Sequence, residues 1–173
     1  MKAIVVDNFF DNFKNIEESL KKIPLYNLKQ YNKKFPRMGD WPGYRSGDLS
    51  VVHPILHNLL IKEIFDKFKI DFFSSAKFIE IKSVLHLRTL DSGEDWIHKD
   101  TAQKTLLIYL SKTNLESGTF LYEEDANPST IVKFIQNRAL LFDCDIKHRS
   151  ISNYGNNIDD GRLTLNCFIN SKK

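Results

Sequence analysis

The chain has 173 residues, of which 42% are hydrophobic and 12% aromatic, and we expect a single domain with a sizeable core. Its formal net charge of +3 comes from interspersed positive and negative residues, so the charge pattern gives no support to a nucleic-acid partner. No stretch approaches the roughly 20 consecutive apolar residues of a membrane span, so we expect no membrane partner either.

The first residues, "MKAIVV", form a short apolar run that acidic residues follow closely. This pattern predicts a strand rather than a signal peptide, and we therefore expect a cytoplasmic protein. Cys144 and Cys167 both lie in apolar runs near the C-terminus. Buried free thiols are more common there than a disulfide, which also fits a reducing compartment.

Two helices are expected in the first third of the chain. Residues 11–23 carry apolar side chains at helical spacing, with Asp11 placed as the N-cap and Pro24 at the end. Residues 54–69 form a stronger pattern, with a proline in the first turn and a broad apolar face. Between these helices, residues 36–49 contain several Pro and Gly and few periodic apolar residues, which predicts an ordered loop or lid.

From residue 70 onward the apolar pattern changes from helical to alternating spacing. Short apolar runs, separated by turn clusters, predict strands over residues 77–89, 105–111, 118–124, 130–135, 138–144, 148–154 and 162–169. Helices first and strands later favour an α+β fold with an antiparallel sandwich or barrel. Residues 1–70 would then supply helices that cover one outer face together with the lid loop, and residues 71–173 would form the β core.

A possible metal site lies near the start of the strands. His98 and Asp100 are separated by one residue, so on a strand both side chains point to the same side, with Cα atoms roughly 6.6 Å apart. His148, which follows the apolar run 138–144, is the candidate third ligand. Two histidines and one carboxylate leave three coordination positions open, which suits non-haem Fe(II) that must also bind a cosubstrate and dioxygen. In isolation, the same pair would be read as part of a surface turn.

The last predicted strand begins with Arg162, and the alternation puts Thr164 on the same face. An arginine that points into a barrel is costly unless it meets an anion. A guanidinium with a hydroxyl two residues on matches a carboxylate, which can accept two parallel charge-assisted hydrogen bonds and a neutral one. The alternative is a strand-edge cation that balances Asp159 and Asp160.

Together these motifs resemble the 2-oxoglutarate- and Fe(II)-dependent dioxygenases, and residues 80–170 are similar to the prolyl-4-hydroxylase-like branch. The segments "TLLIYLS", "ESGTFLY" and "RALLFDCDIKHRSISNYGNNIDDGRLTLNCFI" carry the similarity. The resemblance implies a double-stranded β-helix (jelly roll), with Fe(II), 2-oxoglutarate and dioxygen as cofactor and cosubstrates. It also implies hydroxylation of a substrate, with release of succinate and carbon dioxide.

The resemblance assigns roles to individual residues. The residues that match the iron ligands are His98, Asp100 and His148. Arg162 and Thr164 match the residues that bind the distal carboxylate of 2-oxoglutarate, and Tyr109 matches a tyrosine that hydrogen-bonds this cosubstrate. Taken alone, Tyr109 would be read as a core residue.

Three further residues are candidates for contact with the substrate. Tyr44 and Arg45 lie in the loop "DWPGYRSGD", whose residue types are favoured at binding surfaces. Arg88 lies on the strand before the metal motif, where alternation can direct both it and His86 inward. A packed surface loop and a solvent-exposed Arg88 are the alternatives.

The sequence leaves the substrate open between a prolyl or other protein side chain and a free amino acid or small metabolite. A nucleobase is not expected, because no basic stripe with stacking aromatic residues is present. A non-catalytic jelly-roll binding or structural protein and a zinc hydrolase are alternative functions, but neither needs the dicarboxylate anchor of Arg162 and Thr164. His53 and His57, four residues apart without an evident third ligand, are expected to be structural.

Overall fold

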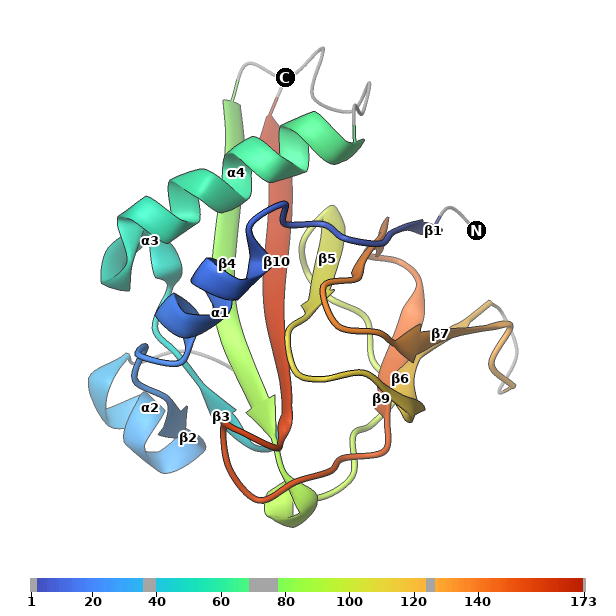
Figure 1. Ribbon diagram of the computed structural model, residues 1–173. Coiled ribbons are helices and arrows are strands. Elements are labelled where there is room, and N and C mark those ends of the chain that lie inside the picture. Colours follow the sequence, from blue (N-terminus) through green and yellow to red (C-terminus); the bar gives the residue numbers. More distant parts are fainter. Residues whose placement is uncertain (1–2, 36–39, 69–77, 124–126, 173) are drawn as a thin grey trace.

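The computed structural model describes residues 3–35, 40–68, 78–123 and 127–172 and consists of two β-sheets with helices on one side (Figure 1). The strands are β1 (Ala3–Val6), β2 (Tyr26–Asn27), β3 (Tyr44–Arg45), β4 (Phe78–Arg88), β5 (Lys104–Tyr109), β6 (Asn114–Tyr122), β7 (Thr130–Phe134), β8 (Ala139–Asp143), β9 (Lys147–Ile151) and β10 (Arg162–Lys172). The helices are α1 (Phe13–Leu20), α2 (Leu28–Lys34), α3 (Leu49–Val52) and α4 (Pro54–Phe68).

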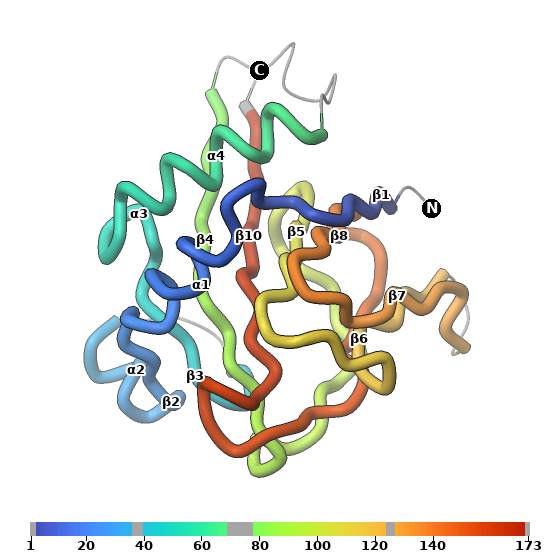
Figure 2. The backbone as a smooth tube through the Cα atoms, in the orientation of Figure 1, coloured from blue at the N-terminus to red at the C-terminus, as the bar shows by residue number. Residues whose placement is uncertain are grey.

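The larger sheet, sheet A, has the strand order β1-β8-β5-β10-β4-β3-β2, and sheet B has the order β7-β6-β9. All the strand pairings described are antiparallel. Neighbouring strands are often distant in sequence, as for β1 and β8, which run side by side in Figure 2. This arrangement is the jelly roll, or double-stranded β-helix, and it confirms the predicted α+β class. Each predicted run overlaps one of the strands β4 to β10, although β6 begins four residues before the predicted run 118–124, and β1 confirms the predicted N-terminal strand.

Sheets A and B enclose an apolar interior. Its buried side chains come from β5 and β8 on one side, from β6 and β7 on the other, and from the turn before β9. They are Leu107, Tyr109, Leu121, Val132, Phe134, Leu140, Phe142 and Ile146. The stacked rings of Tyr109 and Phe134, with centroids 4.4 Å apart, join the two sheets directly.

The two long strands β4 and β10 have two different faces. They pair along their whole length, so side chains of the same parity lie on the same side of both strands. Odd-numbered residues such as Leu85 and Leu165 are buried in the core cluster that includes the helices. Even-numbered residues such as His86 and Thr164 line a cavity on the opposite face. The same ladder therefore supplies a hydrophobic core on one side and polar groups on the other.

Helix α4 lies across β4 and β10 on the odd-numbered face, as Figure 1 shows. It begins at Pro54, and its buried side chains, among them Leu60 and Ile64, pack into the core cluster. The imidazole Nδ1 of His57 lies 2.9 Å from Ser83 Oγ on β4, which makes a buried polar link between helix and sheet. These contacts confirm that N-terminal helices cover one face of the sheet.

The prediction for the first helix is wrong at both ends. The N-cap of α1 is Asn12, and no side-chain hydrogen bond caps the helix. The carboxylate of Asp11 instead accepts a hydrogen bond from Lys67 Nζ at 2.7 Å, a partner in α4 that a local sequence pattern does not contain. The helix ends at Leu20, before Pro24 can limit it.

Residues 26–45 contain short elements that periodicity does not reveal. Helix α2 begins with a capping box, in which Asn27 and Gln30 each accept a hydrogen bond from the backbone N–H of the other. Part of the expected loop 36–49 forms β3, which adds to the edge of β4, and residue 49 begins α3. Residues 36–39 lie outside the described part of the chain.

We expect Leu60→Ala to lower the free energy of unfolding by about 3 kcal/mol, because it creates a cavity in the core between α4 and sheet A. Ile55→Ala in the same helix is the control, since Ile55 is 80% exposed and its truncation should change stability by less than about 0.5 kcal/mol. Urea unfolding followed by circular dichroism measures both. Equal losses in the two variants would contradict the packing of α4.

Candidate metal centre and cavity

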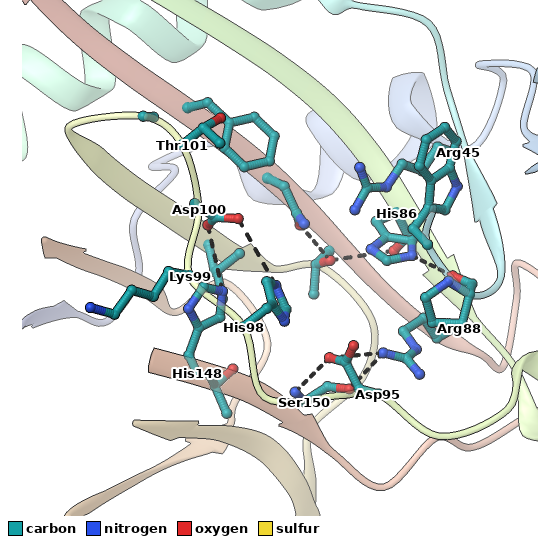
Figure 3. Close-up of a pocket in the computed structure, with 18 of the residues that line it drawn as sticks. Arg45, His86, Arg88, Asp95, His98, Lys99, Asp100, Thr101, His148 and Ser150 are labelled. Atoms are coloured by element: carbon teal, nitrogen blue, oxygen red, sulfur yellow. Dashed lines mark hydrogen bonds and ion pairs between the residues drawn. The ribbon is translucent and has the colours of Figure 1, made fainter. Parts of the chain in front are cut away.

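A cavity of about 510 Å³ lies on the inner face of sheet A. The even-numbered residues of β4 and β10 form one wall, and residues 95–102 together with β9 border another side (Figure 3). Residues 40–45 contribute further lining side chains. The predicted site residues that line this cavity are Arg45, Arg88, His98, Asp100, His148, Arg162 and Thr164. Tyr44 and Tyr109 are not among the lining residues.

His98 and His148 are held opposite each other by their own backbones. The N–H of His98 donates to the carbonyl of His148 at 3.0 Å, and the N–H of His148 donates back at 2.9 Å. The centroids of the two imidazole rings lie 4.4 Å apart. The segment around His98 was expected to be a strand, but its backbone pairs with β9 at this isolated bridge alone among the described residues and then continues as coil. The bridge is sufficient to keep the alternation, since Ile97 and Lys99 are exposed.

Asp100 completes a compact group with the two histidines (Figure 3). Its Oδ1 lies 3.9 Å from His98 Nε2, and its Oδ2 lies 3.5 Å from His148 Nε2. One ligand atom from each residue falls within 4.8 Å of the others, the only such group of His, Cys, Asp or Glu in the described part of the chain. Thr105 Oγ1 donates a hydrogen bond to Asp100 Oδ2 at 2.6 Å and orients the carboxylate. The structure thus brings together all three predicted metal ligands.

Backbone carbonyl groups select the histidine tautomers. Nδ1 of His98 lies 2.9 Å from the carbonyl of Trp96, and Nδ1 of His148 lies 3.2 Å from the carbonyl of Ile146. Because a carbonyl only accepts, each Nδ1 carries the proton, and the neutral ring keeps its lone pair on Nε2, beside Asp100. Burial lowers the pKa of His148, with the nearby Asp100 carboxylate opposing the shift. His148 is therefore neutral near pH 7, the form that binds a metal ion.

Arg162 lies on the same cavity wall and has no counter-ion among the described residues. The residue is 4% exposed, and its Nε is buried without a hydrogen-bond partner. One terminal nitrogen donates to the carbonyl of Gly118 at 3.0 Å, and the guanidinium lies against the rings of Tyr109 and Phe134. Burial lowers the pKa of Arg162 from its ordinary value, but an arginine keeps its charge in proteins. A buried cation without an anionic partner in the described structure fits an anionic ligand.

The other two residues assigned to the cosubstrate are already hydrogen-bonded within the protein. Thr164 Oγ1 lies 2.7 Å from Asn166 Oδ1 and 3.3 Å from the carbonyl of His86. The hydroxyl of Tyr109 donates to Thr119 Oγ1 at 2.7 Å, and the residue is fully buried. Tyr109 packs against Arg162 rather than reaching the cavity, so its assignment as a direct contact stays a prediction.

Among the described residues, Arg88 is the one cavity arginine with a carboxylate partner. It is 1% exposed and forms an ion pair with Asp95 at 2.9 Å, and it also donates to Ser150 Oγ and to the carbonyl of Gly93. Asp95 accepts a further hydrogen bond from the backbone N–H of Ser150 at 2.8 Å. This network ties the segment before His98 to β9 and β4. Its contact with a substrate stays a prediction, and no sequence pattern indicates its partnership with Asp95.

Of the two loop residues predicted to contact the substrate, Arg45 lines the cavity and Tyr44 does not. Arg45 pairs with His86 across β3 and β4 and reaches the cavity, where its guanidinium lies over the ring of Trp41 at 4.5 Å. Tyr44 is 39% exposed and lies outside the cavity lining. His86 Nε2 donates to the carbonyl of Pro42 at 2.7 Å, since a carbonyl only accepts. Burial first and Arg45 next hold the pKa of His86 well below the ordinary value, so the ring is neutral. The sequence predicts that the loop containing Trp41 contacts the substrate, but it does not single out the Trp41 indole.

Solved structures share this fold at low sequence identity. An oxidoreductase of the 2OG-Fe(II) oxygenase family from Burkholderia pseudomallei is 12% identical, with a TM-score of 0.69 over 97% of this chain and 84% of that chain. HygX from Streptomyces hygroscopicus, with nickel, 2-oxoglutarate and hygromycin B bound, is 15% identical, with a TM-score of 0.68 over 98% and 83%. A prolyl 4-hydroxylase from Phytophthora capsici is 18% identical, with a TM-score of 0.59 over 99% and 59%. At these identities the likeness shows a shared fold.

No protein-family profile and no curated protein sequence matches this chain. Among the helices of the described residues, none has the length and apolar character needed to span a lipid bilayer.

We expect Asp95→Asn to destabilise the protein by about 3 kcal/mol, because it leaves the buried Arg88 without its counter-charge. Burial alone would raise the pKa of Asp95, but Arg88 and Ser150 outweigh it, so the folded pKa lies below the ordinary value. The stabilisation is therefore present above the unfolded pKa of about 4 and is lost as the pH falls through the lower folded value. Urea unfolding between pH 3 and 7 should show a stability difference between wild type and variant that shrinks towards low pH. A difference that is constant with pH would contradict an ionised Asp95.

Proposed function

We propose that the protein is an Fe(II)- and 2-oxoglutarate-dependent dioxygenase that hydroxylates a small molecule or a peptide side chain. The observation that carries this proposal is the presence, in one cavity, of a two-histidine, one-carboxylate group and a buried arginine that has no counter-ion in the described structure. The fold shared with 2-oxoglutarate oxygenases supports it. Neither a zinc hydrolase nor a non-catalytic binding protein requires the dicarboxylate anchor that the unpaired Arg162 would provide.

The residues present fit the metal. His98 and His148 would each offer Nε2, and Asp100 one carboxylate oxygen, a donor set that suits Fe(II) and leaves positions for a cosubstrate and dioxygen. When bound, the iron with 2-oxoglutarate and dioxygen supplies the oxidising chemistry, which converts 2-oxoglutarate to succinate and carbon dioxide. The carbonyl groups behind each Nδ1 and the hydroxyl of Thr105 orient the ligands before any metal arrives.

The cosubstrate would be bound through its distal carboxylate. The guanidinium of Arg162 would offer charge-assisted hydrogen bonds from nitrogen atoms that lack partners. Thr164 has one hydroxyl proton, now directed to Asn166 or to the carbonyl of His86, and it would turn that proton to the carboxylate. Tyr109 would support the position of Arg162 without touching the cosubstrate, since its ring packs against the guanidinium and its hydroxyl donates to Thr119.

The substrate side of the cavity is formed by Arg45, Trp41, His86 and the paired Arg88. In this proposal Arg88 fixes the cavity wall, and the other three groups face the substrate. Both prolyl 4-hydroxylases and an enzyme that binds the small molecule hygromycin B share this fold, so the fold is compatible with either a peptide or a small molecule.

We also propose that the whole chain acts as one catalytic domain, since helices from the first third support strands from the last. We retain the cytoplasm as the proposed location, which the free thiols of Cys144 and Cys167 support.

Anaerobic mixing with Fe(II) and 2-oxoglutarate should give the weak visible charge-transfer band of the chelate, and admission of oxygen should yield succinate. His148→Ala should lose both signals, because it removes a ligand from a three-ligand set. His53→Ala is the matched control, since His53 lies outside the cavity lining and should keep the band. No band in the wild type would contradict the proposed function.

Arg162→Ala should weaken 2-oxoglutarate binding by about 2–4 kcal/mol, the scale of a lost buried charge pair. Titration of the charge-transfer band gives the affinity directly. Arg138→Gln is the control, because Arg138 pairs with Asp7 away from the cavity and should leave the affinity unchanged. Equal 2-oxoglutarate affinities in wild type and Arg162→Ala would show that the anchor lies elsewhere.

A further inference from the structure

Besides Arg162, the cavity contains a second arginine, Arg45, for which the described part of the chain supplies no counter-ion. We propose that Arg45 and Trp41 form a binding site for the carboxylate of the primary substrate, which is therefore a small carboxylic acid. This inference rests on the proposed function, which already assigns Arg162 to 2-oxoglutarate. It goes further by naming the chemical class of the substrate and the two side chains that recognise it.

Strand pairing directs Arg45 into the cavity. Arg45 on β3 lies opposite His86 on β4, and directly paired residues share one face of a sheet. His86 lines the cavity, and so does Arg45 (Figure 3). Neither a hydrogen bond nor an ion pair to Arg45 occurs within the described structure, and its Nε is buried without a partner.

Aromatic packing holds the guanidinium in a fixed orientation. Its central carbon lies 4.5 Å from the centroid of the Trp41 ring, a cation–π contact. Trp41 is itself fixed by an edge contact with Tyr31 on α2, at 4.8 Å between centroids and 85° between planes. This contact uses none of the N–H groups of Arg45 as hydrogen-bond donors to another protein group, so they are available to a ligand. The indole Nε1 of Trp41 is also buried without a partner, so two kinds of unused donor lie side by side.

The charges around Arg45 favour an anion. Burial lowers the pKa of Arg45 to about 10, so the group remains positively charged at neutral pH. The carboxylates that stabilise this charge from a distance are Asp100 and Asp95. Asp95 is already paired with Arg88, and Asp100 belongs to the metal group. Neither carboxylate is therefore available to neutralise Arg45 when a metal ion is bound.

The two unpaired arginines form separate subsites. β3 and β10 pair with opposite edges of β4, so Arg45 and Arg162 start from strands roughly 10 Å apart, two strand spacings. One dicarboxylate at Arg162 and one substrate carboxylate at Arg45 can therefore be bound together. A guanidinium and an indole N–H match a carboxylate, which is planar and accepts hydrogen bonds through both of its oxygen atoms. A volume of about 510 Å³ for both ligands limits the substrate to a small molecule.

Tryptophan fluorescence gives a direct test, because both tryptophans of the chain, Trp41 and Trp96, line the cavity. Protein loaded with Zn(II) and 2-oxoglutarate, which cannot turn over, is titrated with proline, leucine and hexanoate and with the matching prolinamide, leucinamide and hexanamide. We expect at least one acid to bind about tenfold or more tightly than its amide, the scale of a charge-assisted hydrogen bond. Arg45→Gln should abolish this preference, and Arg45→Lys should restore part of it. The control Arg138→Gln should bind as the wild type does.

The outcomes separate this proposal from the proposed function. If none of the acids binds better than its amide, or if Arg45→Gln keeps the preference, the carboxylate site is wrong even when the Fe(II)–2-oxoglutarate band forms. Loss of that band in Arg45→Gln would instead assign Arg45 to the cosubstrate and overturn the proposal. A wild type without the band, but with an acid preference that depends on Arg45, would contradict only the dioxygenase function.

Discussion

The antiparallel ladder between β4 and β10 is the constraint on which both the stability and the site depend. It pairs residues 78–88 with residues 162–172 without a break in register, so the parity of a residue fixes the face to which it belongs. Odd-numbered side chains such as Leu85 and Leu165 are buried in the core cluster that includes α4, and even-numbered ones such as His86 and Thr164 line the cavity. A slip of one residue would exchange the two faces and bury Arg162 against the helices. The large apolar area on the odd-numbered face thus also holds the polar groups of the cavity in position.

Within the described residues, the three arginines that line the cavity differ in whether a carboxylate partner neutralises them. Of its three arginines, Arg88 has its own partner in Asp95, and that pair shapes the wall. Arg45 and Arg162 have none within the described structure, although each carries a buried Nε. Desolvation of an unpaired cation opposes folding. Such groups are expected where a ligand compensates them, and local conflicts with the rules of folding concentrate at functional sites.

The sequence predicts much of the site because its signals are periodic or closely spaced. The alternation in the last strand is enough to put Arg162 and Thr164 on one face, and the single residue between His98 and Asp100 directs both side chains to one side. What the sequence does not predict depends on partners brought together by folding. One example is Asp11, which the local pattern assigns to the N-cap of α1 but which forms an ion pair with Lys67 of α4 in the structure.

The same limit applies to the cavity wall. The partnership of Arg88 with Asp95 depends on a turn that no periodicity describes. Trp41 and Arg45 meet only because the two-residue strand β3 adds to β4, and an element of that length has no periodic signal. The histidine ligands are therefore held by the bridge to β9 within the jelly roll. Arg45 and Trp41 instead belong to a segment at the edge of sheet A, which packs against Tyr31 of α2. Because the segment that carries Arg45 and Trp41 contacts the core mainly through the pairing of β3 with β4, these two residues can be substituted while the geometry of the metal ligands stays the same. One fold can in this way keep one reaction chemistry and accept different substrates.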